Sequence, residues 1–457
     1  MKRLFPLLLL IPLTLSCNAI VRQLSFGVTP PPLPTRPPAP TESGAIPISP
    51  TLPPRATATP FVLALEKIAT PPTECSESPL GLDGDKIVEV AYVPSGFCFN
   101  GELDLFETGG HLYVAQSLAF NAAFFITDVT DPANPAIAGM WQWNEYTYTA
   151  DVKAFKQGER RFLSLSLEPS PSNLCGVAIV EVTDPANPIL IGRYEGKNTG
   201  SSSAWCDTHT TQISRDENGD GAYIYASAVN TGDLRVLDIR DLTHVYEVGH
   251  YSHPLRSEST FVHDTTIVGD RVYVAYWAAG LVILDRGQLE SGAEVKPLNP
   301  PNSIDPDGLE IHQAYPTADG NFVFVEDEVN YDGETSQLRM YDIRDLSEPK
   351  EVLQVALDGP FSSPHNMLVD GDLLYVGWYT DGVRVFKYDV SDPNAPTVEP
   401  YAFKAVRSKK TEGVFGSDIY DGVWGVRLHA CEVGGQKTTC VYASDLTRGL
   451  VILAFEP

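Results

Sequence analysis

Four histidines recur at comparable positions along the chain, and their type and spacing point to metal chemistry. They follow one another at intervals of roughly 50 residues, a period typical of repeated β-sheet units. These histidines are His209, His263, His312 and His365. A Glu-Asp-Glu run that includes Glu326 and Glu328 follows the third of them. Imidazole and carboxylate groups together could hold zinc, copper, manganese or iron and leave positions open for water or a substrate.

The same histidines also admit a structural interpretation. A histidine that is copied with each repeat could donate a hydrogen bond to a carbonyl of the next repeat and so join neighbours. Three other repeats carry Leu103, Asp151 and Trp424 near the corresponding position. A purely structural residue should recur in every repeat, so this asymmetry is an argument for function. Both interpretations stay open at the level of sequence.

Two aromatic pairs lie at matching places in two of the repeats. They are Tyr276 with Trp277, and Trp378 with Tyr379. As exposed rings they could stack on a sugar or grip a peptide, because aromatic side chains combine a large apolar face with a polar edge. Ordinary packing beneath a turn is the alternative.

The elements that would position these residues are short strands. Each repeat offers runs of β-branched and aromatic residues separated by Gly-Asp and Asp-Pro turns, a pattern typical of antiparallel strands. The clearest copy begins at His365 and ends at Pro396. Four strands per repeat are expected, with the histidine at the start of the first strand. In a propeller that strand lines the central channel, so the histidines should converge near one mouth of it.

Several runs resemble the LVIVD-repeat family of bacterial β-propellers. Residues 281–285 read Leu-Val-Ile-Leu-Asp and residues 450–453 read Leu-Val-Ile-Leu, close to the family signature. Thr-Asp-Pro-Ala-Asn-Pro segments begin at Thr130 and Thr183. Residues 312–328 and 365–386 also look like propellers of the choice-of-anchor-B group. The resemblance covers residues 86–455 and implies an all-β propeller, but it implies no activity.

The repeats predict about seven four-stranded blades. The last repeat stops after its third strand, at Phe455. Residues 86–92 form a lone strand-like run before the first full repeat. We therefore expect this N-terminal run to supply the missing outer strand and to close the ring, which leaves only short protected edges.

The N-terminal region reads as an export signal followed by a tether. Lys2 and Arg3 precede a short apolar run, and residues 1–17 are expected to be a signal peptide. The small residue before Cys17 resembles a bacterial lipobox, which implies lipidation of that cysteine; an ordinary signal peptide is the alternative. Residues 18–73 are rich in Pro, Thr and Ser and predict a semi-extended tether. Residues 74–457 are expected to form the propeller.

The cysteine count fits this interpretation. Seven cysteines are present, and setting Cys17 aside leaves an even number, as disulfides in an exported chain require. Topology favours a hairpin pair and a pair at one face of the ring, with the last pair following by elimination. The expected pairs are Cys431–Cys440, Cys175–Cys206 and Cys75–Cys98.

Composition excludes some classes of function. The formal net charge of −27 would repel nucleic acid, so sequence-independent DNA or RNA binding is excluded. Residues 216–221 resemble the start of a calcium loop, but Ser227 stands where an EF-hand has its bidentate glutamate, so calcium is not expected. Nucleophile elbows, phosphate-binding glycine loops and His-Glu-x-x-His motifs do not occur in the sequence.

Two functions remain. The first is an exported module, facing the cell surface or periplasm and anchored to the membrane by lipid, whose aromatic pairs bind an extracellular protein or glycan. The alternative is a metal-dependent hydrolase or oxidoreductase with a histidine-rich site at the mouth of the channel. The ion would be a transition metal held by the histidines with Glu326 and Glu328.

Overall fold

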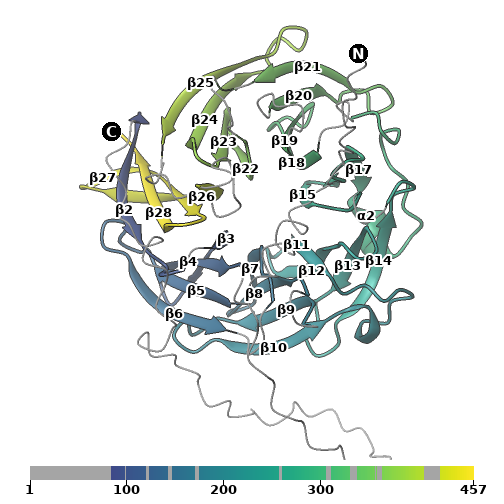
Figure 1. Cartoon of the computed structure of the whole chain (residues 1–457), viewed down its shortest axis with the longest axis horizontal. Helices are drawn as coiled ribbons and strands as arrows, with labels where there is room; N and C mark the ends of the chain where they lie inside the picture. The colour runs from purple at the N-terminus through teal and green to yellow at the C-terminus, as the bar shows by residue number, and fades with distance from the viewer. Residues whose placement is uncertain are drawn as a thin grey trace, which may run out of the picture. The chain divides into compact units, whose positions relative to one another are not determined.

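The protein is a ring of antiparallel β-sheets. The computed structural model describes residues 84–97, 99–119, 123–142, 147–169, 174–256, 260–304, 310–329, 337–355, 357, 363–405 and 422–456. Within these residues the strands form seven sheets arranged in a ring (Figure 1), and we call the side-chain-filled centre that the inner strands surround the channel. The expected all-β propeller with about seven blades is confirmed.

Blades 1, 2, 3, 5 and 6 each contain four consecutive strands in chain order outward from the channel, so that the first strand of each is innermost (Figure 1). Blade 1 comprises β3 (Asn100–Thr108), β4 (His111–Leu118), β5 (Ala123–Asp128) and β6 (Ala136–Gln142). Blade 2 comprises β7 (Val152–Gln157), β8 (Arg160–Leu167), β9 (Gly176–Glu181) and β10 (Ile189–Tyr194). Blade 3 comprises β11 (Thr208–Arg215), β12 (Gly221–Ala228), β13 (Asp233–Asp238) and β14 (Tyr246–Ser252). Blade 5 comprises β18 (Glu310–Pro316), β19 (Phe322–Val329), β20 (Leu338–Asp342) and β21 (Lys350–Val355). Blade 6 comprises β22 (Met367–Asp370), β23 (Leu373–Trp378), β24 (Gly382–Asp389) and β25 (Thr397–Lys404), with the short β1 (Gly84–Asp85) at its outer edge.

Blade 4 departs from the expected four strands. It contains β15 (Asp264–Val268), β16 (Arg271–Ala275) and β17 (Leu281–Asp285), and the helix α2 (Arg286–Ser291) follows. Asp285 caps this helix by accepting a hydrogen bond from the Gln288 N–H, and Gly292 ends it in the left-handed region. In blades 1, 2, 3, 5 and 6 an aspartate three residues after the third strand accepts a hydrogen bond from the N–H two residues further on. After β17 the corresponding residue is Gln288, which lies in the helix.

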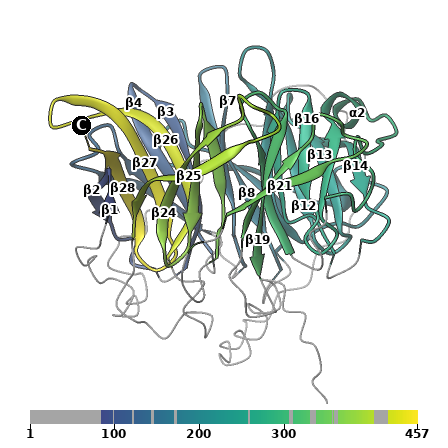
Figure 2. The same cartoon turned by 90° about the horizontal axis from the view of Figure 1, so that it is seen from above.

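Blade 7 combines the two ends of the described chain. It contains β26 (Val423–Val433), β27 (Gln436–Asp445) and β28 (Gly449–Phe455), and β2 (Ile87–Val93) pairs with β28 in antiparallel register (Figure 2). Strand β2, from the start of the described chain, therefore lies at the outside of the sheet that holds the last strand.

The core lies between neighbouring blades. Residues of alternating orientation on one sheet pack against the next, as where Ala115 and Phe124 of blade 1 meet Leu163 and Leu165 of blade 2. This packing holds the inner strands at fixed positions around the channel. Among the described residues, no helix has the length and apolar character needed to cross a bilayer.

Candidate metal centre

The four recurring histidines lie in a row in the channel, with each ring in contact with the next. The Nε2 atoms of His209 and His263 lie 3.1 Å apart. Ring centroids are 4.2 Å apart for His263 and His312, and 3.9 Å apart for His312 and His365. All four side chains are at most 2% exposed. The expected convergence is therefore present, and we refer to these residues as the histidine cluster.

The inner strands explain why these histidines converge. His209 lies near the start of β11 and His312 near the start of β18. His263 immediately precedes β15, and His365 lies just before β22. Because the inner strands of successive blades surround the same channel in the same direction, residues at their starts lie at the same height.

Hydrogen bonds from outside the cluster orient three of the rings. His209 Nδ1 lies 2.5 Å from Glu168 Oε1, His312 Nδ1 lies 3.1 Å from Glu326 Oε1, and His365 Nδ1 lies 2.5 Å from the Trp424 carbonyl oxygen. A carbonyl or carboxylate accepts the Nδ1 hydrogen, which leaves the Nε2 lone pair free to bind a cation. Metal-binding histidines are commonly held in this way by a partner behind the ring.

Several buried nitrogen and oxygen atoms of the site form no hydrogen bond within the described residues. His263 Nδ1, His365 Nε2 and one oxygen of Glu326 have no hydrogen-bond partner there. Ligand atoms of His263, His312 and Glu328 lie within 4.8 Å of one another. Ion–ligand bonds of about 2.1 Å bring such atoms within about 3 to 4 Å of each other, so small side-chain movements would complete a coordination sphere.

The electrostatics of the site also fit a cation. Burial lowers the pKa of His263 and His312 well below the ordinary value, and it lowers the pKa of His365 to about 3. Neutral imidazole is the form that binds metal. Burial, with Glu328 and other carboxylates nearby, raises the pKa of Glu326 well above its ordinary value. A bound cation would relieve that repulsion.

His209 differs from the other three histidines. Burial lowers its pKa, but the adjacent Glu168 carboxylate more than offsets this effect, and the pKa lies above its ordinary value. Sequence reasoning missed Glu168. It follows β8, where a glutamate next to a proline carries no distinctive pattern, and only the ring brings it to His209. Its position at the end of the second strand of blade 2 corresponds to that of Glu326 and Glu328 at the end of β19.

The expected aromatic platform requires a correction. Tyr276, Trp277, Trp378 and Tyr379 are all at most 2% exposed, so they present no face to a sugar or peptide. Instead, the Trp277 ring stacks on His263 with centroids 4.4 Å apart. The Tyr379 hydroxyl donates a hydrogen bond of 2.5 Å to Glu328. Trp277 and Tyr379 therefore contact the histidine cluster and its carboxylate, whereas Tyr276 and Trp378 pack in the cores between blades.

The two aromatic residues that contact the histidine cluster, Trp277 and Tyr379, have an uncommon backbone conformation. Trp277 has φ of 44° and Tyr379 has φ of 27°, both in the left-handed region that side chains other than glycine rarely adopt. Each ring packs on a histidine of the cluster, and packing of this kind can hold a strained backbone at a functional site.

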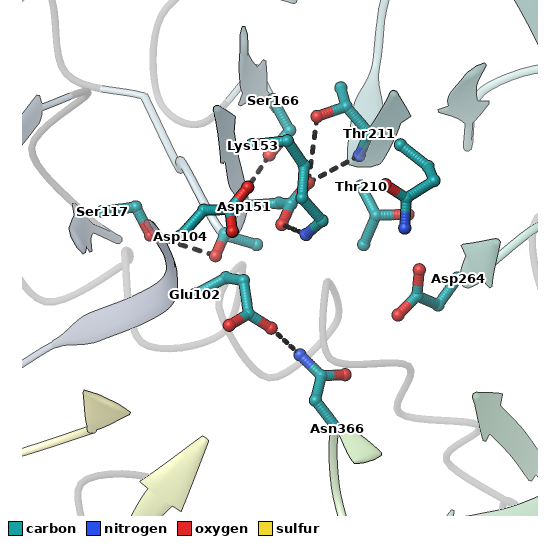
Figure 3. Close-up of polar contacts among 12 residues, drawn as sticks. Glu102, Asp104, Ser117, Asp151, Lys153, Ser166, Thr210, Thr211, Asp264 and Asn366 are labelled. Carbon is teal, nitrogen blue, oxygen red and sulfur yellow. Dashed lines mark hydrogen bonds and ion pairs between the residues drawn. The ribbon is translucent and has the colours of Figure 1, made fainter. Parts of the chain in front are cut away.

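Charged and polar side chains of several inner strands come together in Figure 3, among them Asp264 and Asn366, which directly follow His263 and His365 in sequence. We call Glu102, Asp151, Lys153, Asp264 and Asn366 the channel belt. Lys153 pairs with Asp151, and Asn366 donates a hydrogen bond to Glu102. Burial raises the pKa of Asp264 to about 6, although Lys153 opposes the shift. The belt joins blades that are distant in sequence.

The disulfides and the acidic turn complete the comparison with the sequence predictions. Disulfides join Cys175 to Cys206 and Cys431 to Cys440, as expected. Cys75 and Cys98, like Cys17, lie outside the described residues. In the turn expected not to bind calcium, Asp216 accepts hydrogen bonds from the N–H groups of Asn218 and Asp220. Its carboxylate therefore stabilises a turn between β11 and β12.

Known proteins resemble the chain in sequence repeats and in fold. The LVIVD repeat family matches residues 175–196, 218–253 and 262–285, which span blades 2 to 4. No curated protein matches the chain. The periplasmic gluconolactonase PpgL of Pseudomonas aeruginosa has a TM-score of 0.48 at 13% sequence identity, covering 65% of this chain and 82% of that chain. A candidate 6-phosphogluconolactonase of Bacteroides uniformis has a TM-score of 0.46 at 10% identity, covering 72% of this chain and 90% of that chain. At this level of similarity neither structure carries an argument about activity. The chain therefore carries LVIVD repeats within a β-propeller of seven sheets.

Proposed function

We propose that the protein is a metal-dependent enzyme whose transition-metal ion is held by the histidine cluster. The observation that carries this proposal is the convergence of four buried imidazoles, three of them oriented from behind by a carboxylate or a carbonyl. A purely structural role would need no such convergence, because each histidine could be satisfied within its own blade pair.

A site in which all four histidines bound one ion would favour redox chemistry. Catalytic zinc generally has three protein ligands and one open position, whereas four ligands give a closed tetrahedral site. An ion that accepts five or six ligands, such as iron, would keep positions open beside four imidazoles. We therefore place an oxidoreductase ahead of a hydrolase, and the identity of the bound metal decides between them.

The surface-binding function has lost its main support. It depended on exposed aromatic pairs, and the four rings are buried. A protein or glycan partner would have to bind elsewhere on the molecule. Absence of a bound metal in the experiment below would restore this function as the better account.

The decisive experiment measures metal content. The full chain is exported into an oxidising compartment, purified without chelator or histidine tag, and subjected to elemental analysis. We expect about one equivalent of a transition metal, and we expect the H263A/H312A variant to lose it. The control variant H111A/H250A removes two histidines whose side chains are 53% and 48% exposed, and it should retain the metal.

The identity of the bound metal distinguishes the two classes of enzyme. Iron or copper would support the oxidoreductase, and zinc would favour the hydrolase. A metal-free wild-type protein that gains no thermal stability from added zinc, copper, manganese or iron would contradict the proposal, because a ligand that binds the folded state must stabilise it.

We further propose that the enzyme is exported and tethered by a lipid on Cys17. The two disulfides are typical of an oxidising compartment outside the cytoplasm. The Pro-rich residues 18–73 would hold the propeller away from the membrane. Labelling of cells with a radioactive fatty acid should mark the wild-type protein and not the Cys17→Ser variant. Equal labelling of the two would contradict the anchor.

A further inference from the structure

A pocket lies at the opposite end of the inner strands from the histidine cluster. Its volume is about 340 Å³, within the range of small-molecule sites. Arg215 lines it and is the last residue of β11, whereas His209 lies near the start of the same strand. At about 3.3 Å per residue these positions are on the order of 20 Å apart. The pocket is therefore separate from the proposed metal centre.

The floor of the pocket is apolar and its rim is basic. Phe106 and Phe155 contribute to the floor, and both are buried. Arg161, Arg215 and Lys156 contribute to the rim. This local excess of positive charge contrasts with the formal net charge of −27 for the chain. The contrast matters because acidic residues are plentiful enough to neutralise every cation.

Two of the three rim cations have no carboxylate partner in the described part of the chain. Most arginines there form an ion pair with an aspartate or glutamate, but Arg161, Arg215 and Arg271 do not. Two of these three line this one pocket. Lys156, in contrast, lies 3.2 Å from Asp220.

Backbone carbonyls hold the guanidinium groups of Arg161 and Arg215 in place, and some N–H donors of each group form no hydrogen bond within the described residues. Arg161 donates from Nε to the Glu107 carbonyl and from Nη1 to the carbonyls of Gly158 and Arg160, which leaves Nη2 unused. Arg215 donates from Nη2 to the Ala154 carbonyl, 2.9 Å away. Carbonyl contacts fix the orientation of a guanidinium without cancelling its charge, and such a group is suited to bind a carboxylate.

The acidic member of the rim does not neutralise these arginines. Glu107 Oε1 lies 3.3 Å from His429 Nε2, and both residues line the pocket. The contact of Glu107 with Arg161 runs through the backbone carbonyl and not through the carboxylate.

We propose that this pocket binds a small organic anion, with a carboxylate group held by Arg161 and Arg215 and an apolar body resting on Phe106 and Phe155. Guanidinium groups supply charge-assisted hydrogen bonds to the carboxylate, and the rings bury the apolar part of the ligand. The site is independent of the metal centre and of the chemistry that the metal supports.

Titration calorimetry with benzoate tests the site on the full-length protein. We expect saturable binding that weakens as the salt concentration rises, because the rim is open to solvent. The R161Q/R215Q variant should bind benzoate at least ~10-fold more weakly. R271Q is the matched control, since Arg271 also lacks a carboxylate partner but lies outside the pocket; it should bind as the wild type does. If the double variant does not fold, the single variant R215Q, which alters an exposed side chain, replaces it and should also bind benzoate more weakly.

Two further probes separate the charge from the apolar body. Benzyl alcohol should bind far more weakly than benzoate because it lacks the charge, and inorganic phosphate should bind more weakly because it lacks the apolar body. The proposal is overturned if wild-type protein does not bind benzoate, if R161Q/R215Q binds it unchanged, or if either probe matches benzoate. None of these outcomes depends on the metal content.

Discussion

At the scale of single residues, Glu168 links two blades through one hydrogen bond. Its carboxylate lies behind His209, in the position that raises the basicity of a metal-binding imidazole. In the proposed metal centre, the histidine cluster would therefore depend on a residue that does not touch the ion. Glu326 has the same relation to His312.

The Glu168→Gln variant should lower metal affinity by about 10- to 100-fold, because the amide retains the acceptor but loses the charge. The measurement is competition with a chromogenic chelator. The control is Glu181→Gln in the same blade, whose carboxylate pairs with the exposed Arg160 and should not affect the ion. Equal affinities for the two variants would show that Glu168 does not support the metal.

Gly425 determines how the channel belt is assembled. A Cβ atom at this position would lie 2.3 Å from Glu102 Oε1, so glycine leaves the space through which Glu102 reaches Asn366. Blade 1 thereby contacts blade 6 across blade 7. A sequence alone does not reveal that this glycine is required for space and not for its backbone conformation.

The Gly425→Ala variant should lose about 1 to 3 kcal/mol of unfolding free energy, since the added methyl group overpacks a tight site. Urea denaturation measures the loss. Gly287→Ala is the control, because its nearest neighbour would be 3.3 Å away and alanine is favoured in a helix. In the G425A/E102A double variant the two losses should not add, because Glu102 is the group that the methyl displaces. Full additivity would locate the strain elsewhere.

At the scale of elements, strand β2 links the start of the described chain to its end. Ile87 is 2% exposed and packs in the core between blades 6 and 7, while its neighbour Val88 is 37% exposed. The alternation follows from the two-residue period of a strand with one face buried. The same two residues thus provide a test of how much this pairing stabilises the ring.

The Ile87→Ala variant should destabilise the protein by about 2 to 5 kcal/mol, the range for truncating a buried isoleucine. Val88→Ala should cost less than about 1 kcal/mol, because only strand propensity is affected. Thermal denaturation of the two variants compares them directly. Similar losses would mean that β2 does not contribute its buried face to blade 7.

At the scale of the whole molecule, the two disulfides span loops of different length. Cys175 and Cys206 are 31 residues apart and hold the connection between blades 2 and 3, whereas Cys431 and Cys440 are 9 residues apart within one hairpin. A longer loop loses more entropy on closure in the unfolded chain. The longer link should therefore stabilise the ring more.

From loop length alone, the C175S/C206S variant should lose about 3.7 kcal/mol of unfolding free energy and C431S/C440S about 2.6 kcal/mol. Urea denaturation under non-reducing conditions gives both values, and the order of the two is the robust part of the prediction. A larger loss for the hairpin pair would contradict the loop-length explanation.

The sequence by itself determined the strands, the repeat and the residues worth testing. Turns at Asp-Pro segments and alternating apolar runs are local signals, so the blades and the placement of the histidines at the starts of inner strands followed from them. The hairpin between Cys431 and Cys440 was predictable for the same reason, because both cysteines lie in adjoining strands of one blade. In blade 4 four strands were expected, and the helix after β17 was not.

Only the tertiary structure decided what surrounds those histidines. Glu168 and His209 are 41 residues apart, and Glu102 and Asn366 are 264 residues apart, so no local pattern joins them. The same holds for Trp277 and Tyr379, whose aromatic character fits an exposed platform as well as a buried wall. Burial and partners depend on how whole blades pack around the channel, and that packing is a property of the closed ring, which no single repeat contains.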